Sequence, residues 1–557
     1  MLEIEEKITS DVLVAGTGLA GLRAARTLAE KGLRVLLISR GKFCSGSSFY
    51  PLTAGLGSQL YDTEEDKEVF LREVLETGLG VADEKLCRLL IEETPAVVEK
   101  QPELGMHPYS SVTNRPACFA KRERRLRSWG GWDQIRREAG VNFAEYENLT
   151  ILQFCDLLRV VTKDGQVAGA LVCDHDDRLL YVQVPVVILA TGGICGMYKH
   201  SLNTADTCGS GHSVALDAGA SLINMEFLQF IPGFTKPVYQ LLFSETTLRR
   251  CSSVKNADGE EILRKYLPEG VSFRDCMEDR AMHGPFTCND RSKYFEIAMM
   301  DDARKHRREC GFAIQFDPGI AGDDNGYIRS ARKVYGGYGI DLAKDIIWLG
   351  SFAHCANGGI LADENARTAV RGLYAAGEAM GGIHGADRHG GMATAAALVF
   401  GERAAQDAAR YIEGLTERPE VFSDTAAMEL AGWLDTKGSG ALRPEEVMLT
   451  VAEEMWYEAN AIRDEKGLAA LLGKVMEMQE TYNALARIRS GGSVRESLKA
   501  FHTLRTAEAM LRTMLERTES RGPHYRADFP AADPAWQGKR ILVTEGKDTG
   551  ILKVSVI

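Results

Sequence analysis

The sequence predicts an α/β fold built on a Rossmann-like unit, with an inserted domain and a helical C-terminal region. Three observations support this prediction: a glycine-rich turn between a strand and a helix near the N-terminus, a second strand and glycine turn near residue 375, and amphipathic helices after residue 414. A chain of 557 residues exceeds one ordinary core, so two or three domains are expected.

The first element is a βαβ unit. Residues 12–15 form a continuous apolar run that suits a strand buried on both faces, and residues 19–31 have helical spacing that ends at Gly32. Residues 34–39 read as the next strand. A parallel pair joined by a helix is therefore expected here.

The turn of this unit carries a glycine motif. Gly16 permits the tight turn, Gly18 lets the backbone approach a pyrophosphate, and Gly21 allows close packing of helix on strand. The N–H groups at the start of the helix, at Leu19 and Ala20, favour an anion. The motif predicts a dinucleotide site because it lies between a strand and a helix, although Ser39 occupies the place of the usual acidic ribose ligand.

The remaining elements divide the chain into four expected segments. A small β-meander is predicted over residues 151–161, 167–173 and 179–183, followed by a buried strand over 184–190. Residues 225–345 are polar and irregular, with short helices such as 295–308, and the βαβ pattern resumes at 372–378 with a helix over 391–414. Amphipathic helices follow, among them 445–464 and 494–516.

Composition limits the partners and the location. The net charge of −12 and the pI near 5.6 disfavour nucleic acid and anionic membrane surfaces. No apolar run reaches membrane-spanning length, and residues 1–7 lack the features of a signal peptide, so a cytoplasmic protein is expected. The twelve cysteines include no C-x-x-C pair, so reduced thiols are expected and no metal site is predicted.

Taken together, the motifs resemble the flavoprotein-subunit family of succinate dehydrogenase, fumarate reductase and L-aspartate oxidase, over nearly the whole chain. The matching segments are Ser39-Arg40 after the second strand, residues 46–50, 190–193 and 208–211, and the E-S-R-G-P-H-Y-R run at 519–526. The resemblance implies an FAD-binding domain in two parts, 1–224 and 346–414, an α+β capping domain at 225–345, a helical domain at 415–557, and an active site between FAD and cap.

The resemblance also implies the residues that contact FAD. They are Gly16, Gly18, Leu19, Ala20, Gly21, Ser39, Arg40, Ser47, Ser48, Gly55, Ala190, Thr191, Gly192, Glu378, Arg388 and Ala393. Binding is expected to be noncovalent, because Ser48 stands where the family's covalent attachment uses a histidine. Helix capping is the structural alternative for Glu378.

A second set of residues is implied for catalysis. Arg274 resembles the family's acid/base arginine, with a surface ion pair to Asp275 as its structural alternative. His354 and Arg388 resemble the residues that bind a substrate carboxylate, Arg388 as a bidentate anchor. Ser244 and Glu245 fall where the family places further substrate and proton-relay groups. The family's next arginine falls at Leu248, and Arg249, just beyond it, is the candidate for its place in a proton relay.

The expected reaction is reduction of the C=C bond of an α,β-unsaturated carboxylic acid, or the reverse dehydrogenation. Electrons would come from or go to a separate protein, such as an iron–sulfur subunit, because the chain shows no second redox centre. Two alternatives remain open: L-aspartate oxidase, and a flavin-bearing electron-transfer subunit whose substrate pocket has decayed. Ile231 replaces the family's second carboxylate-binding histidine, which disfavours fumarate unless Arg249 or another cation compensates.

Overall fold

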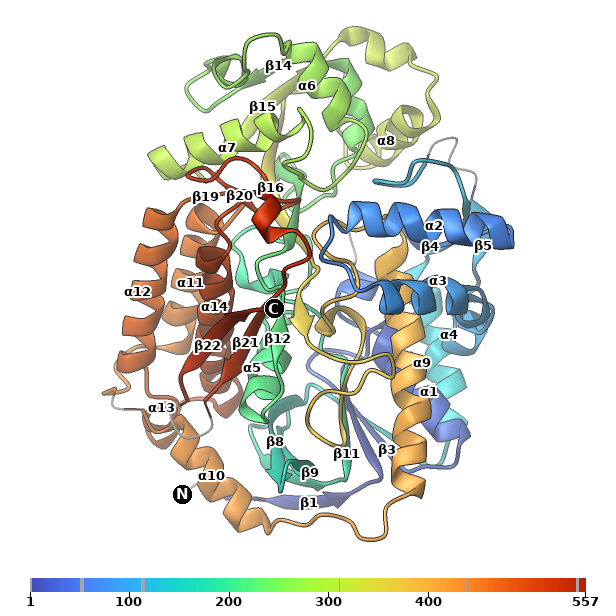
Figure 1. The fold of residues 1–557 in the computed structure, drawn as a ribbon, viewed down its shortest axis with the longest axis vertical. Helices are drawn as coiled ribbons and strands as arrows, with labels where there is room; N and C mark the ends of the chain where they lie inside the picture. The colour runs from blue at the N-terminus through green and yellow to red at the C-terminus, as the bar shows by residue number, and fades with distance from the viewer. Residues whose placement is uncertain (1–2, 51–54, 112–115, 310, 437, 547–549) are drawn as a thin grey trace.

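The computed structural model describes residues 3–50, 55–111, 116–309, 311–436, 438–546 and 550–557 (Figure 1). Met1 and Leu2, in the segment considered for a signal peptide, lie outside the described residues. The centre of the fold is a five-stranded parallel sheet in the order β18-β11-β2-β3-β7. Its strands are β2 (Val12–Ala15), β3 (Val35–Ser39), β7 (Leu149–Gln153), β11 (Val186–Leu189) and β18 (Leu373–Ala375).

Two helices pack against this sheet and against each other. Helix α1 (Leu19–Glu30) follows β2, and the long helix α9 (Met392–Glu413) packs along α1. Gly401 of α9 allows this contact, since a Cβ atom there would lie 2.6 Å from the Ala20 carbonyl oxygen. The predicted βαβ unit is therefore present, with the helix ending one residue earlier than expected.

Smaller sheets and helices surround the central sheet. One sheet has the order β1-β10-β9-β8, and another has the order β4-β6-β5. Their strands are β1 (Glu6–Thr9), β8 (Asp156–Lys163), β9 (Gln166–Cys173), β10 (Leu179–Gln183), β4 (Leu56–Leu60), β5 (Tyr109–Ser111) and β6 (Arg125–Trp129). Helices α2 (Glu64–Thr77), α3 (Glu84–Glu99), α4 (Trp132–Ala144) and α5 (Ser210–Asp217) complete this part.

The inserted segment forms a cap with its own hydrophobic core, drawn at the top of Figure 1. Its antiparallel sheet has the order β13-β16-β15-β14, with strands β13 (Leu228–Lys236), β14 (Cys251–Lys255), β15 (Phe312–Phe316) and β16 (Ile347–Ala356). Helices α6 (Phe273–Arg280), α7 (Lys293–His306) and α8 (Gly326–Gly336) pack around it. Strand β16 lies beyond the expected boundary at residue 345, yet it pairs with β13 in the cap sheet.

The C-terminal region is mostly helical. Its helices are α10 (Ser423–Leu434), α11 (Pro444–Glu458), α12 (Glu465–Thr481), α13 (Ala484–Arg489) and α14 (Val494–Glu516). The chain then adds a hairpin of β21 (Ile541–Glu545) and β22 (Leu552–Val556), which pairs with β12 (Leu222–Ile223). The C-terminal segment therefore ends in strands as well as helices, and it is tied to the first part of the nucleotide-binding fold.

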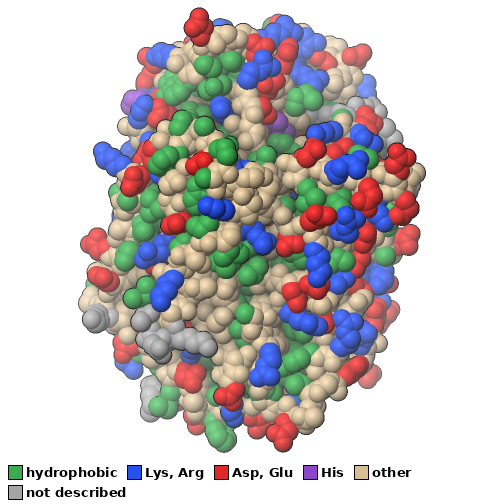
Figure 2. All heavy atoms as spheres, in the orientation of Figure 1, with side chains coloured by type: hydrophobic (Ala, Val, Ile, Leu, Met, Phe, Trp, Pro, Cys, Tyr) green, Lys and Arg blue, Asp and Glu red, His purple; other side chains and the backbone are tan. Residues whose placement is uncertain are grey.

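The surface shows basic and acidic side chains interspersed on the face drawn in Figure 2. Within the described residues, no helix combines the length and the apolar character needed to span a membrane.

Candidate active site

A cavity of about 880 Å³ runs from the glycine turn after β2 to the underside of the cap. Ligand cavities typically measure about 300–1,000 Å³, so this one is large enough for an extended ligand. The carboxyl ends of the parallel strands β2, β3 and β11 border it, and β13 and β16 carry cap residues to its other end. Open α/β sheets bind their ligands at this edge.

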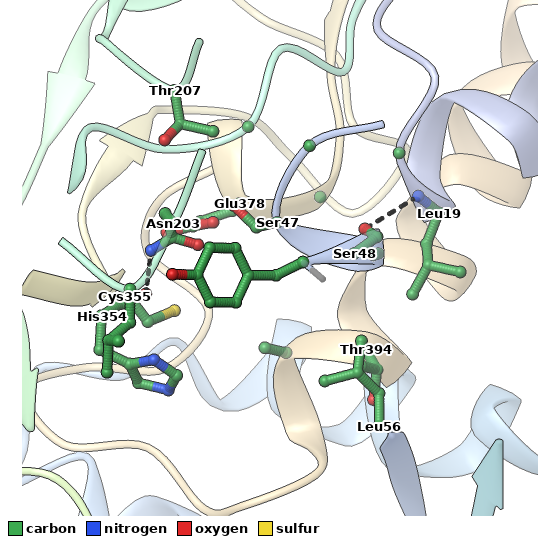
Figure 3. A pocket seen from close by; sticks show the side chains of 18 of the residues that line it. Leu19, Ser47, Ser48, Leu56, Asn203, Thr207, His354, Cys355, Glu378 and Thr394 are labelled. Atoms are coloured by element: carbon green, nitrogen blue, oxygen red, sulfur yellow. Dashed lines mark hydrogen bonds between the residues drawn. The ribbon is translucent and has the colours of Figure 1, made fainter. Parts of the chain in front are cut away.

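The glycine turn forms an anion-binding cradle. Gly16 has a φ of +119°, and a Cβ atom there would lie 2.1 Å from the Ala190 carbonyl oxygen. Gly18 caps α1 without a side-chain hydrogen bond, and the start of a helix favours an anionic group. The Leu19 N–H lies 3.2 Å from the Ser48 hydroxyl oxygen, to which it donates (Figure 3). These features fit the pyrophosphate of a dinucleotide.

An acidic side chain that the sequence motif did not indicate lies in the next part of the cavity, near Ser39. Arg40 lines the cavity and is ion-paired with Asp156, which comes from β8 and also pairs with Arg495 of α14 at 2.6 Å. Asp156 is buried, and the two arginines keep the pKa of its carboxyl below the ordinary value although burial opposes this. An acidic group is thus present beside Ser39, supplied by a distant strand.

Glu378 lies deeper in the cavity, next to the end of the cap sheet (Figure 3). Its Oε1 atom accepts a 2.9 Å hydrogen bond from the Ala356 N–H, and burial raises the pKa of its carboxyl. The Thr191 hydroxyl is buried without a partner among the described residues. A buried acceptor and a buried hydroxyl without a partner fit the polyol chain and ring edges of a flavin nucleotide.

Almost all of the predicted FAD contacts line this one cavity; Gly21 does not. A Cβ atom on Gly21 would lie 1.8 Å from the Gly16 carbonyl oxygen, so this glycine serves the packing of α1 against the turn. Sequence analysis missed several polar lining residues. These are Asp156, Asn203, Asp206 and Thr207, which lie in loops or at a strand start with no motif of their own.

Arg388 is the main electrostatic feature of the cap end. Its side chain lines the cavity, yet the residue is only 7% exposed. Nη1 donates to the His389 carbonyl oxygen at 3.1 Å, and Nε is buried without a partner. Within the described residues, no carboxylate forms an ion pair with it. A buried guanidinium in this state favours an anionic ligand, and its planar donor set fits a carboxylate.

His354 lies close to Arg388, at an irregularity of the cap sheet. The register between β13 and β16 shifts from Gln229 opposite Cys355 to Phe230 opposite Ala353, so His354 is the extra residue of a bulge. The bulge turns its imidazole into the cavity. Burial, and then the charge of Arg388, lower the pKa of His354 to about 3. The imidazole is therefore neutral at pH 7 and can donate one hydrogen bond.

Of the remaining predicted catalytic residues, one lines the cavity and two do not. Glu245 lines the cavity, but Ser244 and Arg249 do not. The Ser244 N–H donates to the Tyr335 hydroxyl at 2.6 Å, while Arg249 is exposed and contacts Met282. Only Glu245 of this group is in position to act on a ligand.

The expectation for Arg274 is corrected by the structure. Its side chain is 84% exposed, lies outside the cavity lining, and forms an ion pair with Glu278 at 2.7 Å on the same helix, α6. The pairing with Glu278 raises its pKa further. An acid/base group must reach the proton that it transfers, and Arg274 does not reach the cavity. Its partner is Glu278 because i and i+4 residues share one face of a helix.

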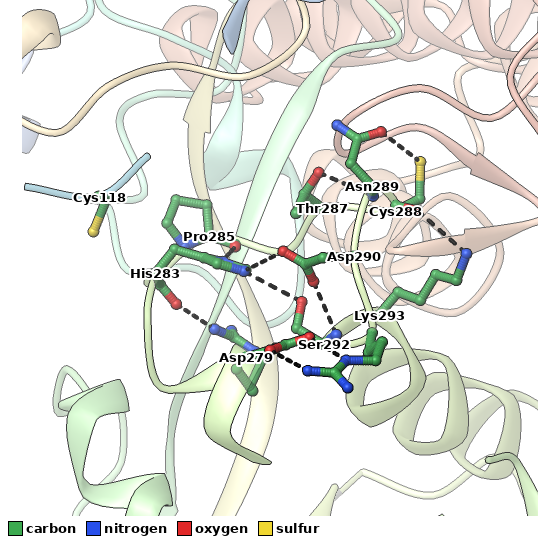
Figure 4. A network of polar contacts seen from close by, with 12 residues as sticks. Cys118, Asp279, His283, Pro285, Thr287, Cys288, Asn289, Asp290, Ser292 and Lys293 are labelled. Carbon is green, nitrogen blue, oxygen red and sulfur yellow. Dashed lines mark hydrogen bonds and ion pairs between the residues drawn. The ribbon is translucent and has the colours of Figure 1, made fainter. Parts of the chain in front are cut away.

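Residues 283–293 of the cap form a network of polar contacts beside the cavity (Figure 4). Gly284 and Pro285 line the cavity, and the neighbouring His283 contacts Asp290 at 3.1 Å. The Thr287 hydroxyl donates to Asp387 at 2.7 Å, directly before Arg388 in the chain. Burial raises the pKa of Asp387 to about 7. This segment therefore connects the cap to the loop that carries Arg388.

Comparisons with known proteins agree with this arrangement. A family model described as an FAD binding domain matches residues 11–394, and one described as a fumarate reductase flavoprotein C-terminal region matches residues 449–556. A fumarate reductase (CoM/CoB) subunit of Methanothermobacter marburgensis is 28% identical, with 96% of both chains covered. An L-aspartate oxidase of Vibrio cholerae is 26% identical, with 96% of this chain and 98% of the relative covered.

Among solved structures, Mycobacterium smegmatis Sdh1 in complex with UQ1 has the same fold. The TM-score is 0.80 at 24% sequence identity, and the match covers 99% of this chain and 94% of the other. The comparisons confirm the predicted α/β fold class and FAD as the cofactor.

Proposed function

Given that the chain belongs to the flavoprotein oxidoreductase family of fumarate reductase and succinate dehydrogenase, we propose that it reduces the C=C bond of an α,β-unsaturated carboxylic acid or catalyses the reverse dehydrogenation. The observation that carries the proposal is Arg388: a buried cation with no carboxylate partner in the described residues, in the same cavity as the FAD cradle.

The residues of the chain have three tasks in this proposal. Bound FAD supplies or accepts a hydride. Arg388 binds the substrate carboxylate through two N–H groups, and neutral His354 donates a further hydrogen bond that orients it. The carbon next to the one that receives the hydride must gain a proton, and Glu245 is the carboxyl group that the cap brings to the cavity. We therefore assign Glu245, and not Arg274, to the proton relay.

Electron transfer requires a second protein in this proposal. The described residues contain no cluster with the ligand set of an iron–sulfur centre, and the matched relative from M. marburgensis is itself named as one subunit of its enzyme. A separate electron donor or acceptor, such as an iron–sulfur protein, would complete the reaction. A cytoplasmic location agrees with this scheme.

L-aspartate oxidase is the second candidate, since relatives of that name match almost the whole chain. One set of assays separates the two activities. The holoenzyme is tested with reduced viologen against a panel of enoates, and with aspartate and oxygen. Oxidation of viologen that depends on an enoate supports the proposal; hydrogen peroxide formed from aspartate would overturn it. If neither occurs while the flavin still exchanges electrons with a dye, an electron-transfer role is indicated.

A further inference from the structure

The cap end of the cavity has an apolar wall. Tyr50, Leu202, Ile231 and Leu242 line the cavity there and belong to one hydrophobic cluster, with Phe352 behind them. Ile231 is 5% exposed and stands opposite Phe352 in the pairing of β13 with β16. Pro232 and Phe243 extend the apolar surface. A substrate group that reaches this wall leaves water and contacts carbon atoms.

The charges around the cavity are distributed unequally. Among the described lining residues the arginines are Arg40 and Arg388, and Arg40 is neutralised by Asp156 at the far end. Among these lining residues the cap contributes one acidic side chain, Glu245. Tyr327 and Ser330 add neutral hydroxyl groups. A substrate with one carboxylate therefore finds its cation in Arg388, whereas a second carboxylate would meet the apolar wall and Glu245.

Resting on the proposed function, we propose that the substrate is a monocarboxylic 2-enoate whose β-carbon carries an apolar, preferably aromatic, group. Its carboxylate binds Arg388 and His354, and its β-substituent packs against the apolar wall. Tyr50 and Phe243 provide ring contacts for an aryl group, which carry geometric preference as well as buried area. A dicarboxylate binds poorly because its second charge would lose its water and find no partner.

Substrate preference tests this inference directly. kcat/KM is measured for cinnamate, crotonate and fumarate with reduced viologen as donor. We expect cinnamate to exceed fumarate by at least tenfold, with crotonate in between because its methyl group covers less of the wall. Fumarate preferred by tenfold or more would overturn the inference while leaving the proposed C=C reduction intact.

A binding measurement separates failure of the inference from failure of the reaction. Oxidised holoenzyme is titrated with 3-phenylpropanoate and with succinate, and the change in the flavin absorbance band gives each Kd. Tighter binding of 3-phenylpropanoate supports the inference even if no enoate is turned over. Absence of turnover would refute the proposed reaction and leave the inference about binding intact. Tighter binding of succinate would refute the inference whether or not turnover occurs.

Substitution of Ile231 provides a third test of the inferred substrate preference. Ile231→His places an imidazole in the wall and should lower the cinnamate-to-fumarate ratio of kcat/KM by at least tenfold. Ile231→Leu keeps the wall apolar and should retain the preference for cinnamate, whatever its absolute rate. FAD content and thermal unfolding show whether each variant is folded. An unchanged ratio in a folded Ile231→His variant would contradict contact between substrate and wall.

Discussion

Replacing Arg388 by glutamine should weaken substrate binding while leaving the free energy of unfolding unchanged or higher. Arg388 is 7% exposed, its Nε has no partner among the described residues, and no ion pair is formed with a described carboxylate. The charge is therefore retained at a cost in folding free energy that a bound carboxylate offsets. Arg388→Gln should abolish carboxylate binding without lowering stability.

The magnitude follows from the donor set. Two N–H groups of Arg388 can donate to one carboxylate, and a hydrogen bond to a charged group contributes about 1.5–3 kcal/mol, so the pair contributes about 3–6 kcal/mol. At about 1.4 kcal/mol for each tenfold change, kcat/KM should fall by roughly two to four powers of ten. Steady-state kinetics with reduced viologen measure this loss, and flavin absorbance shows whether FAD is still bound.

A matched control is available in Arg280. This arginine is also buried, but it is paired with Glu296 at 2.6 Å. Arg280→Gln leaves a buried carboxylate unpaired and should destabilise the protein by about 3–5 kcal/mol. Thermal unfolding should thus show a lower midpoint for Arg280→Gln and an equal or higher one for Arg388→Gln. If Arg388→Gln keeps kcat/KM within tenfold of the original protein, Arg388 is not the carboxylate anchor.

Three other predictions concern the proton donor, pH and the flavin linkage. Arg274→Ala should change kcat/KM by less than about threefold, because exposed substitutions change free energies by about 0.5 kcal/mol; a hundredfold loss would instead show that the cap moves Arg274 into the cavity. The pKa of Asp387 is raised from 3.8 to about 7 by burial, so its contribution to stability is present below pH 3.8 and is lost as the pH rises through 7. Stability should fall by about 1.4 kcal/mol per pH unit within that window, and denaturant unfolding of Asp387→Asn should show a flatter profile; an equally steep one would place the titration elsewhere. Acid precipitation should release free flavin, because Ser48 stands in the place of the family's attachment histidine; flavin that stays in the pellet would contradict noncovalent binding.

Local sequence patterns were sufficient to predict individual strands, helices and the glycine turn. Strand β2 and helix α14 occur at the predicted residues, because an apolar run and a 3.6-residue period specify buried strands and amphipathic helices directly. The glycine turn was equally readable. Gly16 needs its positive φ for reasons of backbone geometry that act over a few residues.

The predicted domain boundary at residue 345 illustrates what local sequence patterns cannot predict, namely which sheet a strand joins. Strand β16 follows a polar segment and precedes the returning nucleotide-binding fold, so sequence alone could not decide which sheet it joins. Pairing with β13 is a contact between residues more than a hundred positions apart. The same pairing produces the bulge that turns His354 into the cavity.

Charge partners were decided only in three dimensions. Arg274 and Arg388 each follow an aspartate or precede one in the sequence, and both matched family motifs. The fold leaves Arg274 in water beside Glu278, and buries Arg388 without an ion pair to a described carboxylate. Asp156 reached Arg40 from another sheet. The sequence by itself determined the fold class and FAD as the cofactor, because the strand, the glycine turn and the helix that indicate them depend on short-range geometry. Only the tertiary structure decided that Arg388, unlike Arg274, forms no ion pair with a described carboxylate, because burial and pairing depend on distant segments meeting in space.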